Sequence, residues 1–324
     1  MKTVFVTGAS GFIAKHIVKQ LLEKGHQVKA SVRSAKKKEE LETLFPGQLT
    51  YAILDLTKDD GWEEALSGCE ALIHTASPFP LESPKDPQVL IVPAVEGTKR
   101  AMRAAHQAGI KRVVLTSSNA AIYKDAAKMP EAPSTEDNWT TPDGPSTSAY
   151  EASKTLAERA AWEMADELGL ELTCINPALV VGPALDKHYG TSLNLVKRLV
   201  KGQDPLAPPM NIGVVDVRDV AKMHVEALSL DKTVGHRYSA NAGMLSFLEM
   251  GQILNANIEE SKAPKREAPF WLIKFLSFFM ADLKTVVASY GLNLDVPGHR
   301  AEKDFGFTFI PPQDALIAAA KSLD

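Results

Sequence analysis

A tyrosine and a lysine four residues apart form the pair in this chain with the clearest chemical potential. Tyr150 and Lys154 lie in the segment AYEASKTLAE, whose residues have strong helix propensity. Four residues make about one helical turn, so the phenol and the ammonium lie on the same helix face. A free phenol has a pKa of about 10, and a nearby cation lowers that pKa because it favours the phenolate. The spacing is that of an acid–base catalyst that works near neutral pH, but such pairs also occur by chance on many helix surfaces, so the context of the pair has to decide.

The N-terminal segment has the pattern of a strand, a glycine turn and a helix. A buried strand is predicted at residues 3–6 and an amphipathic helix at residues 12–24. Between them, Gly8 permits a tight turn, Gly11 lets a pyrophosphate approach the backbone, and Ala14 allows the helix to pack closely on the strand. The N-terminus of the helix offers free N–H groups to an anion. This G-x-x-G-x-x-A turn predicts a dinucleotide site.

The end of the next predicted strand, at residues 28–32, indicates which dinucleotide binds. NAD sites usually place an Asp or Glu there, and that anion would repel the 2′-phosphate of NADP. In this chain Arg33 follows the strand, and its guanidinium can stack on adenine or bind phosphate. Three lysines at residues 36–38 follow, so NADP(H) is favoured. The alternative is a solvated basic start to the following helix, balanced by Glu39 and Glu40.

Composition indicates a protein with one large core. The chain has 324 residues, of which 45% are hydrophobic and 23% charged, with a net charge of −4. It has no basic stripe, so we expect no nucleic-acid partner. Cys69 and Cys174 lie in apolar runs and are expected to be buried, reduced thiols. The eight histidines show no metal-binding spacing, and the apolar run before Gly8 is too short for a signal peptide, so we expect no metal and a cytoplasmic location.

Strand-like and helix-like segments alternate through the first half of the chain. Strands are predicted at residues 3–6, 28–32, 49–54, 71–74, 112–116 and 171–175, and helices at 12–24, 37–44, 89–108 and 149–168. This order predicts an α/β fold with a doubly wound parallel (Rossmann) sheet. We expect a dinucleotide-binding domain at residues 1–182 and a smaller substrate-binding lobe at 183–324, from which segments near 214–230 return to the first domain. Ligands of such sheets bind beyond the carboxyl ends of the strands.

Several motifs together carry a family resemblance that covers nearly the whole chain. They are VTGASGFIAKHIV, VRS, HTASPF at residues 74–79, VVLTSSNAA at 113–121, YEASKTLAERAAW, NPALVVGP at 176–183 and DVRDVA at 216–221. On these motifs the chain resembles the extended short-chain dehydrogenases/reductases. Within them it is similar to the dihydroflavonol reductase and cinnamoyl-CoA reductase branch, with the pattern of the NADPH-dependent aldehyde, ketone and methylglyoxal reductases.

The resemblance implies a catalytic triad of Ser118, Tyr150 and Lys154. Ser118 would hydrogen-bond the substrate carbonyl oxygen, and Tyr150 would donate a proton to it as hydride arrives. Lys154 would hold the nicotinamide ribose and lower the pKa of Tyr150. The chemistry is sound, because hydride addition creates an alkoxide and each donor placed beside it contributes about 3 kcal/mol of transition-state stabilisation. Ser118 could otherwise simply terminate a strand.

The resemblance also implies the cofactor contacts. The residues would be Gly8, Ser10, Gly11, Phe12 and Ile13 at the pyrophosphate, Arg33 and Lys37 at the 2′-phosphate, Asp55 and Leu56 at the adenine, Thr75 and Ala76 along the middle, Pro177 to Val180 along the nicotinamide, and Ser192 on the far side of the phosphates. Thr191 is an alternative to Ser192 at the phosphates, and Lys36 and Lys38 are alternatives to Lys37 at the 2′-phosphate. His74 is interpreted as a structural residue at a strand end rather than an acid or base.

The segment APFWLIKFLSFFMADLK stands out in the C-terminal lobe. It is too short and interrupted to span a membrane, which needs about 20 apolar residues. Read as one helix, it has a narrow polar face that contains Lys274 and Lys284 and a wide apolar surface that must be covered on more than one side. We expect core packing of the lobe; a wall of the substrate pocket, a subunit contact and membrane association are the alternatives.

These observations predict an NADPH-dependent reductase of small aldehydes or ketones that acts as a monomer or homodimer without a membrane partner. A sugar-nucleotide epimerase or dehydratase with a resident NAD is an alternative, which Arg33 and the apolar C-terminal lobe disfavour. A non-catalytic NADP-sensing protein is another. Such a sensor would be expected to lack Tyr150 or Lys154, so their joint presence disfavours it.

Overall fold

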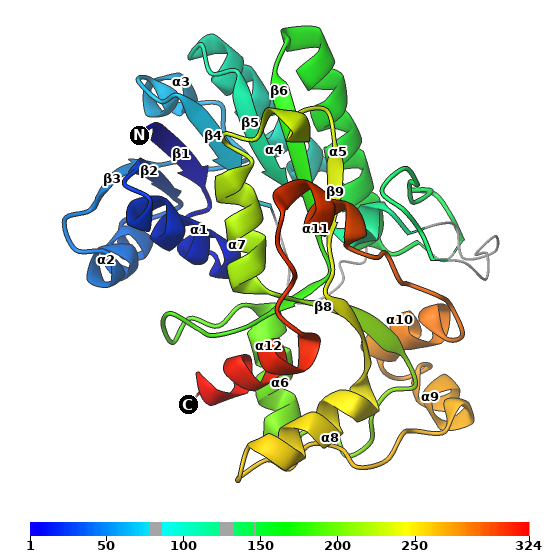
Figure 1. The fold of residues 1–324 in the computed structure, drawn as a ribbon. Helices are drawn as coiled ribbons and strands as arrows, with labels where there is room; N and C mark the ends of the chain where they lie inside the picture. The colour runs from blue at the N-terminus through cyan, green and yellow to red at the C-terminus, as the bar shows by residue number, and fades with distance from the viewer. Residues whose placement is uncertain (78–85, 124–132, 146, 324) are drawn as a thin grey trace.

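The computed structural model describes residues 1–77, 86–123, 133–145 and 147–323. The last two residues of the HTASPF motif, Pro78 and Phe79, lie outside these ranges. Within the described chain, a large parallel sheet with helices on both faces carries a smaller lobe at one end (Figure 1). The predicted α/β doubly wound fold is confirmed.

The main sheet runs in the order β3-β2-β1-β4-β5-β6-β9, and every neighbouring pair is parallel. Its strands are β1 (Thr3–Thr7), β2 (Gln27–Val32), β3 (Leu49–Ile53), β4 (Ala71–His74), β5 (Arg112–Thr116), β6 (Glu171–Pro177) and β9 (Arg237–Ala240). The order reverses between β1 and β4, the position at which open parallel sheets bind ligands. The first six strands agree with the sequence prediction to within two residues at each end, whereas β9 was not predicted.

Four helices supply most of the helical cover of this sheet. They are α1 (Phe12–Glu23), α4 (Gln88–Gln107), α5 (Ala149–Leu168) and α7 (Val217–Glu226). Helix α2 (Ala35–Leu44) packs near β2 and β3 at the edge of the sheet, and α3 (Trp62–Leu66) is a short helix beside α4. Helix α5 begins with a capping box, in which Ser148 and Glu151 satisfy each other's backbone N–H groups, and ends at Gly169 in the left-handed conformation. The sequence therefore fixes both ends of the helix that carries Tyr150.

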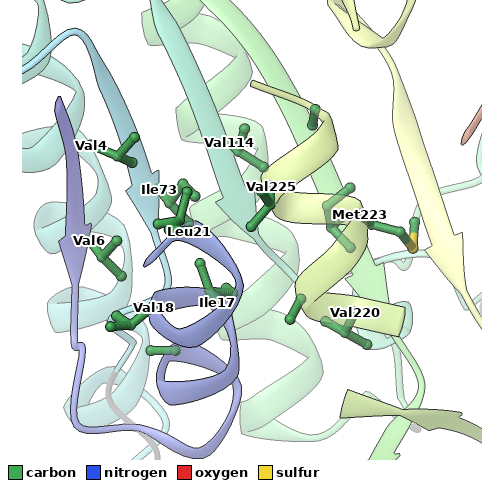
Figure 2. Close-up of a cluster of buried hydrophobic side chains, with 14 of the residues drawn as sticks. Val4, Val6, Ile17, Val18, Leu21, Ile73, Val114, Val220, Met223 and Val225 are labelled. Atoms are coloured by element: carbon green, nitrogen blue, oxygen red, sulfur yellow. The ribbon is translucent and has the colours of Figure 1, made fainter. Parts of the chain in front are cut away.

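Successive side chains of each strand point to opposite faces of the sheet, so the hydrophobic core has two parts, one on each face. Figure 2 shows one face, where α1 and α7 pack over the strands through Val4, Val6, Ile17, Val18, Leu21, Ile73, Val114, Val220, Met223 and Val225. The opposite face buries Phe5, Leu72 and Leu115 against residues of α4 and α5 such as Met102 and Ala161. Side chains at odd and even positions of a strand thus face different helices, which decides where each polar residue near a strand end points.

The smaller lobe has its own sheet and core. Strands β7 (Leu179–Val181), β8 (Asn211–Asp216) and β10 (Gly243–Ser246) pair in the order β10-β8-β7. The helices of this part are α6 (Thr191–Val200), α8 (Phe247–Asn257), α9 (Phe270–Leu276), α10 (Ala281–Ser289) and α12 (Pro312–Lys321). Helix α11 (His299–Phe305) packs instead on the main sheet beside β9 (Figure 1). Two short 3-10 turns, η1 (Asn119–Ala121) and η3 (Asp231–Thr233), lie elsewhere in the chain. Helices α6, α8 and α12 share one hydrophobic cluster, so they hold the lobe together.

The prediction of one covered apolar helix at residues 269–284 is wrong. The segment forms two short helices, α9 and α10, separated by a turn at residues 277–279 and by Met280 in an extended conformation. The apolar surface is also open: Trp271 is 70% exposed and Phe278 77% exposed. Among the described side chains of this region, a small buried group includes Ile273 and Val286.

Candidate active site

The glycine turn after β1 has the geometry of a phosphate cradle. Gly8 has a φ of +62°, and a Cβ added there would lie 3.0 Å from the Cα of Ala76, so this position requires glycine. Gly11 is the N-cap of α1; its N–H donates to the Gly8 carbonyl at 2.9 Å, and no side chain caps the helix. No acidic residue occupies the first turn of α1. The N–H groups of Phe12 and Ile13 therefore begin a helix whose positive end suits an anion.

A second helix N-terminus lies beside the first. Helix α6 starts after Gly190, also without a side-chain cap or an acidic first turn. A Cβ added to Gly190 would lie 3.6 Å from the Cβ of Phe12, and Phe12 packs against the core clusters of both lobes. This contact places the first turn of α6, which contains Thr191 and Ser192, beside the glycine turn. The sequence predicted Ser192 there from family likeness alone.

The positively charged side chains after β2 differ in their contacts. Arg33 is exposed and close enough to Asp55 for its charge to contribute to the lowered pKa of that carboxyl, behind the hydrogen bonds from Thr57. Lys37 is already paired, with its ammonium 2.6 Å from Glu40. The ammonium of Lys38 lies over the Tyr51 ring at 5.4 Å. Of the charges predicted to meet a 2′-phosphate, Lys37 would therefore have to share its ammonium with Glu40.

Other predicted cofactor residues lie along the same edge of the sheet. Thr75 and Ala76 follow β4, and their N–H groups both donate to the Thr7 hydroxyl at 3.1 Å, which ties this loop to the end of β1. Leu56 packs against Gly97 of α4, where a Cβ would approach it to 3.2 Å. Pro177 ends β6. The side chain of Val180 is buried in the core beside α1 and α7, so Val180 could meet a cofactor only through its backbone.

Ser118, Tyr150 and Lys154 come together at the carboxyl end of β5. Ser118 caps the η1 turn: its side chain accepts from the Ala120 N–H at 3.1 Å, and its carbonyl accepts from the Asn176 amide at 3.1 Å. The Ser118 and Tyr150 side chains are hydrogen-bonded to each other. Lys154 lies one turn further along α5 and is 9% exposed. The structure thus groups the three predicted catalytic residues.

The pKa of Tyr150 moves opposite to the sequence prediction. Burial raises it above its usual value, the Ser118 hydrogen bond opposes that rise, and the charge of Glu151 adds to it. The prediction of a lowered pKa considered only the neighbouring lysine and neglected desolvation of the phenolate. A raised pKa keeps the phenol protonated at neutral pH, which is the form that can donate a proton.

The pKa of Lys154 is lowered to about 8, chiefly because burial penalises the ammonium, while the charge of Glu158 acts in the opposite direction. Both protonation states of this amine are therefore populated near the working pH of most enzymes. An amine of this kind can respond to small changes in its surroundings.

A buried ion pair lies behind the three residues. Arg237 of β9 contacts Glu158 of α5 with an Nε–Oε1 distance of 2.6 Å, and the side chains are 8% and 0% exposed. Glu158 also accepts from Ser117 at 2.5 Å and from Asn176 at 2.8 Å. The Arg237 guanidinium lies 3.6 Å from the centre of the Trp139 ring and donates to backbone carbonyls before α5. This network joins α5 to β5, β6 and β9 and so fixes Tyr150 relative to Ser118.

Sequence reasoning missed this network. Glu158 follows Lys154 by four residues, so the spacing Tyr150–Lys154–Glu158 on one helix face was a signal that could have revealed it. Arg237 gave no such signal, because β9 reaches the sheet from a distant part of the sequence. The buried Lys15 of α1, which pairs with Asp186 of the segment after β7 at 2.5 Å, was also missed.

Among the described residues, no cluster of His, Cys, Asp or Glu could hold a metal ion. In the same part of the chain, no helix is long and apolar enough to cross a membrane. Cys69 and Cys174 are buried free thiols.

A Rossmann sheet, an uncapped glycine turn and a grouped Ser–Tyr–Lys set are the features expected of extended short-chain dehydrogenases/reductases. The chain belongs to the NAD dependent epimerase/dehydratase family, which it matches over residues 4–243. It is 34% identical to cinnamoyl-CoA reductase 1 of Petunia hybrida over 329 residues, covering 99% of this chain and 92% of that protein.

Two further comparisons point to one yeast enzyme. The NADPH-dependent methylglyoxal reductase GRE2 of Saccharomyces cerevisiae is 34% identical over 284 residues, covering 78% of this chain and 82% of the relative. The crystal structure of yeast methylglyoxal/isovaleraldehyde reductase Gre2 complexed with NADPH superimposes with a TM-score of 0.81 at 29% identity, covering 99% and 98% of the two chains. The resemblance stated from the sequence motifs is thereby confirmed.

Proposed function

We propose that the protein is an NADPH-dependent reductase that converts an aldehyde or ketone into an alcohol. The observation that carries this proposal is the grouping of Ser118, Tyr150 and Lys154 at the same sheet edge as the Gly8–Gly11 turn. Relatives named as NADPH-dependent or cinnamoyl-CoA reductases over most of the chain support it.

The residues present fit a bound dinucleotide. The position of Gly8 has no room for a side chain, and the uncapped N-termini of α1 and α6 present backbone donors to a pyrophosphate. Ser10, Gly11, Phe12, Ile13 and Ser192 would hold the phosphates, and Arg33 with Lys37 the 2′-phosphate. Asp55 and Leu56 would contact the adenine, and Thr75 and Ala76 would contact the middle of the dinucleotide. At the nicotinamide end the contacts would come from Pro177, Val180 and Lys154. A reduced nicotinamide dinucleotide held by these residues would supply hydride to the carbonyl carbon.

Residues of the chain itself would bind and protonate the carbonyl oxygen of the substrate. The Ser118 hydroxyl, oriented by the Ala120 N–H, donates a hydrogen bond to the carbonyl oxygen. Tyr150 keeps its proton because burial raises its pKa, and it transfers that proton to the oxygen as negative charge develops there. Lys154 holds the ribose and supplies positive charge beside the phenol. Two fixed donors at the developing alkoxide each contribute about 3 kcal/mol of transition-state stabilisation.

The family name itself favours a second candidate, an epimerase or dehydratase with a tightly held NAD. The end of β2 argues against it, because Arg33 stands where an NAD site usually has an acid.

The test is to mix the purified protein separately with NADPH and NADH and to follow cofactor absorbance with small dicarbonyls, aryl aldehydes, ketoesters and flavanonols. We expect oxidation of NADPH well above that of NADH with at least one of these classes. Preference for NADH, or turnover of a nucleotide sugar without net cofactor oxidation, would contradict the proposal.

A further inference from the structure

One segment of the smaller lobe is tied to a helix of the proposed cofactor site. Residues 183–190 connect β7 to α6 and contact α1 at two points through side chains. Nε2 of His16 donates to the Pro183 carbonyl at 2.9 Å. The ammonium of Lys15 lies 2.5 Å from the Asp186 carboxylate, and the lysine side chain is only 4% exposed. These two contacts hold the segment in a fixed position beside α1.

His188 reaches from this segment to α2. Its backbone N–H donates to the Asp186 carboxylate at 3.0 Å, and its ring Nδ1 lies 3.8 Å from the same carboxylate. On the other side of the ring, Nε2 lies 3.4 Å from Oε1 of Glu40. The imidazole therefore lies between two carboxylates, one on its own segment and one on α2.

Glu40 is shared between His188 and Lys37. Its Oε2 accepts from the Lys37 ammonium at 2.6 Å, and its side chain is 14% exposed. Its Oε1 is buried and accepts no hydrogen bond from the described residues. The hydrogen bond from Lys37 lowers the pKa of Glu40 against the effect of burial, and the charges of Lys37 and His188 add to this. The carboxylate is therefore ionised at neutral pH.

An ionised Glu40 limits the positive charge that Lys37 can offer to a phosphate. Lys37 lies in the first turn of α2, shortly after Arg33 at the end of β2. Sheets of this type accommodate the 2′-phosphate of NADP at the end of this strand. A carboxylate that already binds the lysine competes there with the phosphate. A cation on the Oε1 side competes in turn with Lys37 for Glu40, and His188 occupies that side.

We propose that Glu40 is a specificity-determining residue of the 2′-phosphate subsite, and that His188 is its second partner, supplied by the smaller lobe. Glu40 withholds part of the Lys37 charge from the cofactor, and His188 reduces this effect by attracting the same carboxylate. The inference rests on the proposed function, because it takes Lys37 as a contact of the 2′-phosphate. It adds an acidic residue that lowers the preference for NADPH and a contact between the lobes that adjusts it.

The first test removes the charge of Glu40. Glu40→Gln keeps the size of the side chain and a carbonyl oxygen that can accept from Lys37. Binding of NADPH and of NADH to the purified protein is measured by fluorescence titration at matched ionic strength. We expect the ratio Kd(NADH)/Kd(NADPH) to rise by about 2 to 5-fold, the effect of one exposed charge pair.

The matched control is Glu39→Gln, which removes the same charge from the neighbouring, exposed position of α2. We expect it to leave the ratio of dissociation constants unchanged. An unchanged or lower ratio in Glu40→Gln would contradict the inference. An equal rise in both variants would also contradict it, because the effect would then come from the net charge of the helix.

The second test places a permanent cation at the position of His188. We expect His188→Arg to raise the same ratio by about 2 to 5-fold, because it draws Glu40 away from Lys37. In a protein that also carries Glu40→Gln, more than half of this gain should disappear. A gain of equal size in both backgrounds would show that a cation at this position acts on the phosphate directly, and no gain in either would show that it does not compete for Glu40. Either result would contradict the role of His188.

These titrations do not depend on turnover, so they separate the inference from the proposed function. A protein that shows the expected shifts but reduces no carbonyl compound would refute the proposed function and leave the inference standing. A protein that reduces carbonyl compounds with NADPH, and whose Glu40→Gln and His188→Arg variants keep the parent ratio, would refute the inference alone. A parent protein without preference for NADPH would overturn both.

Discussion

The two ends of the proposed cofactor site have ion pairs of equal length in different surroundings. At the catalytic end, Arg237 and Glu158 approach to 2.6 Å, and neither side chain is more than 8% exposed. At the adenosine end, Lys37 and Glu40 also approach to 2.6 Å, but the lysine is 35% exposed. The first pair is fixed by further hydrogen bonds from Ser117 and Asn176.

This difference fits the demands of the two tasks. Proton transfer requires donors fixed in advance to within a fraction of an ångström, because misplacement weakens transition-state stabilisation. Selection of a phosphate requires positive charge within reach, which solvated side chains can supply. We therefore expect changes at the catalytic end to affect rate and stability strongly, and changes at the adenosine end to affect cofactor choice alone.

The largest effect is expected from Tyr150→Phe, which keeps the ring and removes the proton donor. Loss of a positioned general acid lowers kcat by about 100 to 10,000-fold. Binding of NADPH, measured by fluorescence titration, should remain. Turnover within a few-fold of the parent, on a substrate whose chemical step limits the rate, would show that another group supplies the proton.

The next largest effect is on stability. Arg237→Met leaves Glu158 buried without its partner, and breaking a buried pair in this way costs about 3 to 5 kcal/mol in the free energy of unfolding. The matched control is Lys37→Met at the exposed pair, for which we expect less than about 1 kcal/mol. Urea denaturation of the cofactor-free proteins measures both. Equal losses in the free energy of unfolding of the two variants would contradict the distinction between the two ends of the proposed cofactor site.

A smaller effect is expected at Arg33. Loss of a charge-assisted hydrogen bond to the 2′-phosphate costs about 1.5 to 3 kcal/mol, so Arg33→Ala should lower the NADPH/NADH ratio of kcat/KM by roughly 10 to 150-fold. Lys38→Ala removes a charge from the same edge, and its ammonium lies over Tyr51. We expect this control to leave the ratio nearly unchanged at matched ionic strength. If this ratio changed in Lys38→Ala but not in Arg33→Ala, the contact with the 2′-phosphate would have to be assigned to Lys38 of α2 instead.

The sequence predicted the features that depend on local patterns. The glycine turn, the first six strands and the helix of Tyr150 all follow from hydrophobic periodicity, capping and turn residues. The grouping of Ser118 with Tyr150 followed from family likeness and is present in the structure.

Features that depend on distant parts of the chain were not predictable in the same way. Strand β9 and Arg237 meet Glu158 only after the chain has crossed the smaller lobe and returned. The raised pKa of Tyr150 depends on burial by several elements, which no local spacing encodes. The break between α9 and α10 lies at the turn of residues 277–279 and the extended Met280, inside a segment whose apolar pattern alone predicts one continuous helix.

Transfer of deuterium tests the central claim most directly. The protein would be given NADPH carrying deuterium at the reactive carbon of the nicotinamide, each stereoisomer in turn, with a carbonyl compound that it reduces. We expect one stereoisomer to place one deuterium on the carbinol carbon of the released alcohol, detected by mass spectrometry, with one cofactor oxidised for each alcohol formed. Products without deuterium from either stereoisomer, or a cofactor that returns to its reduced form within each turnover, would contradict the account and favour internal redox chemistry of the epimerase type.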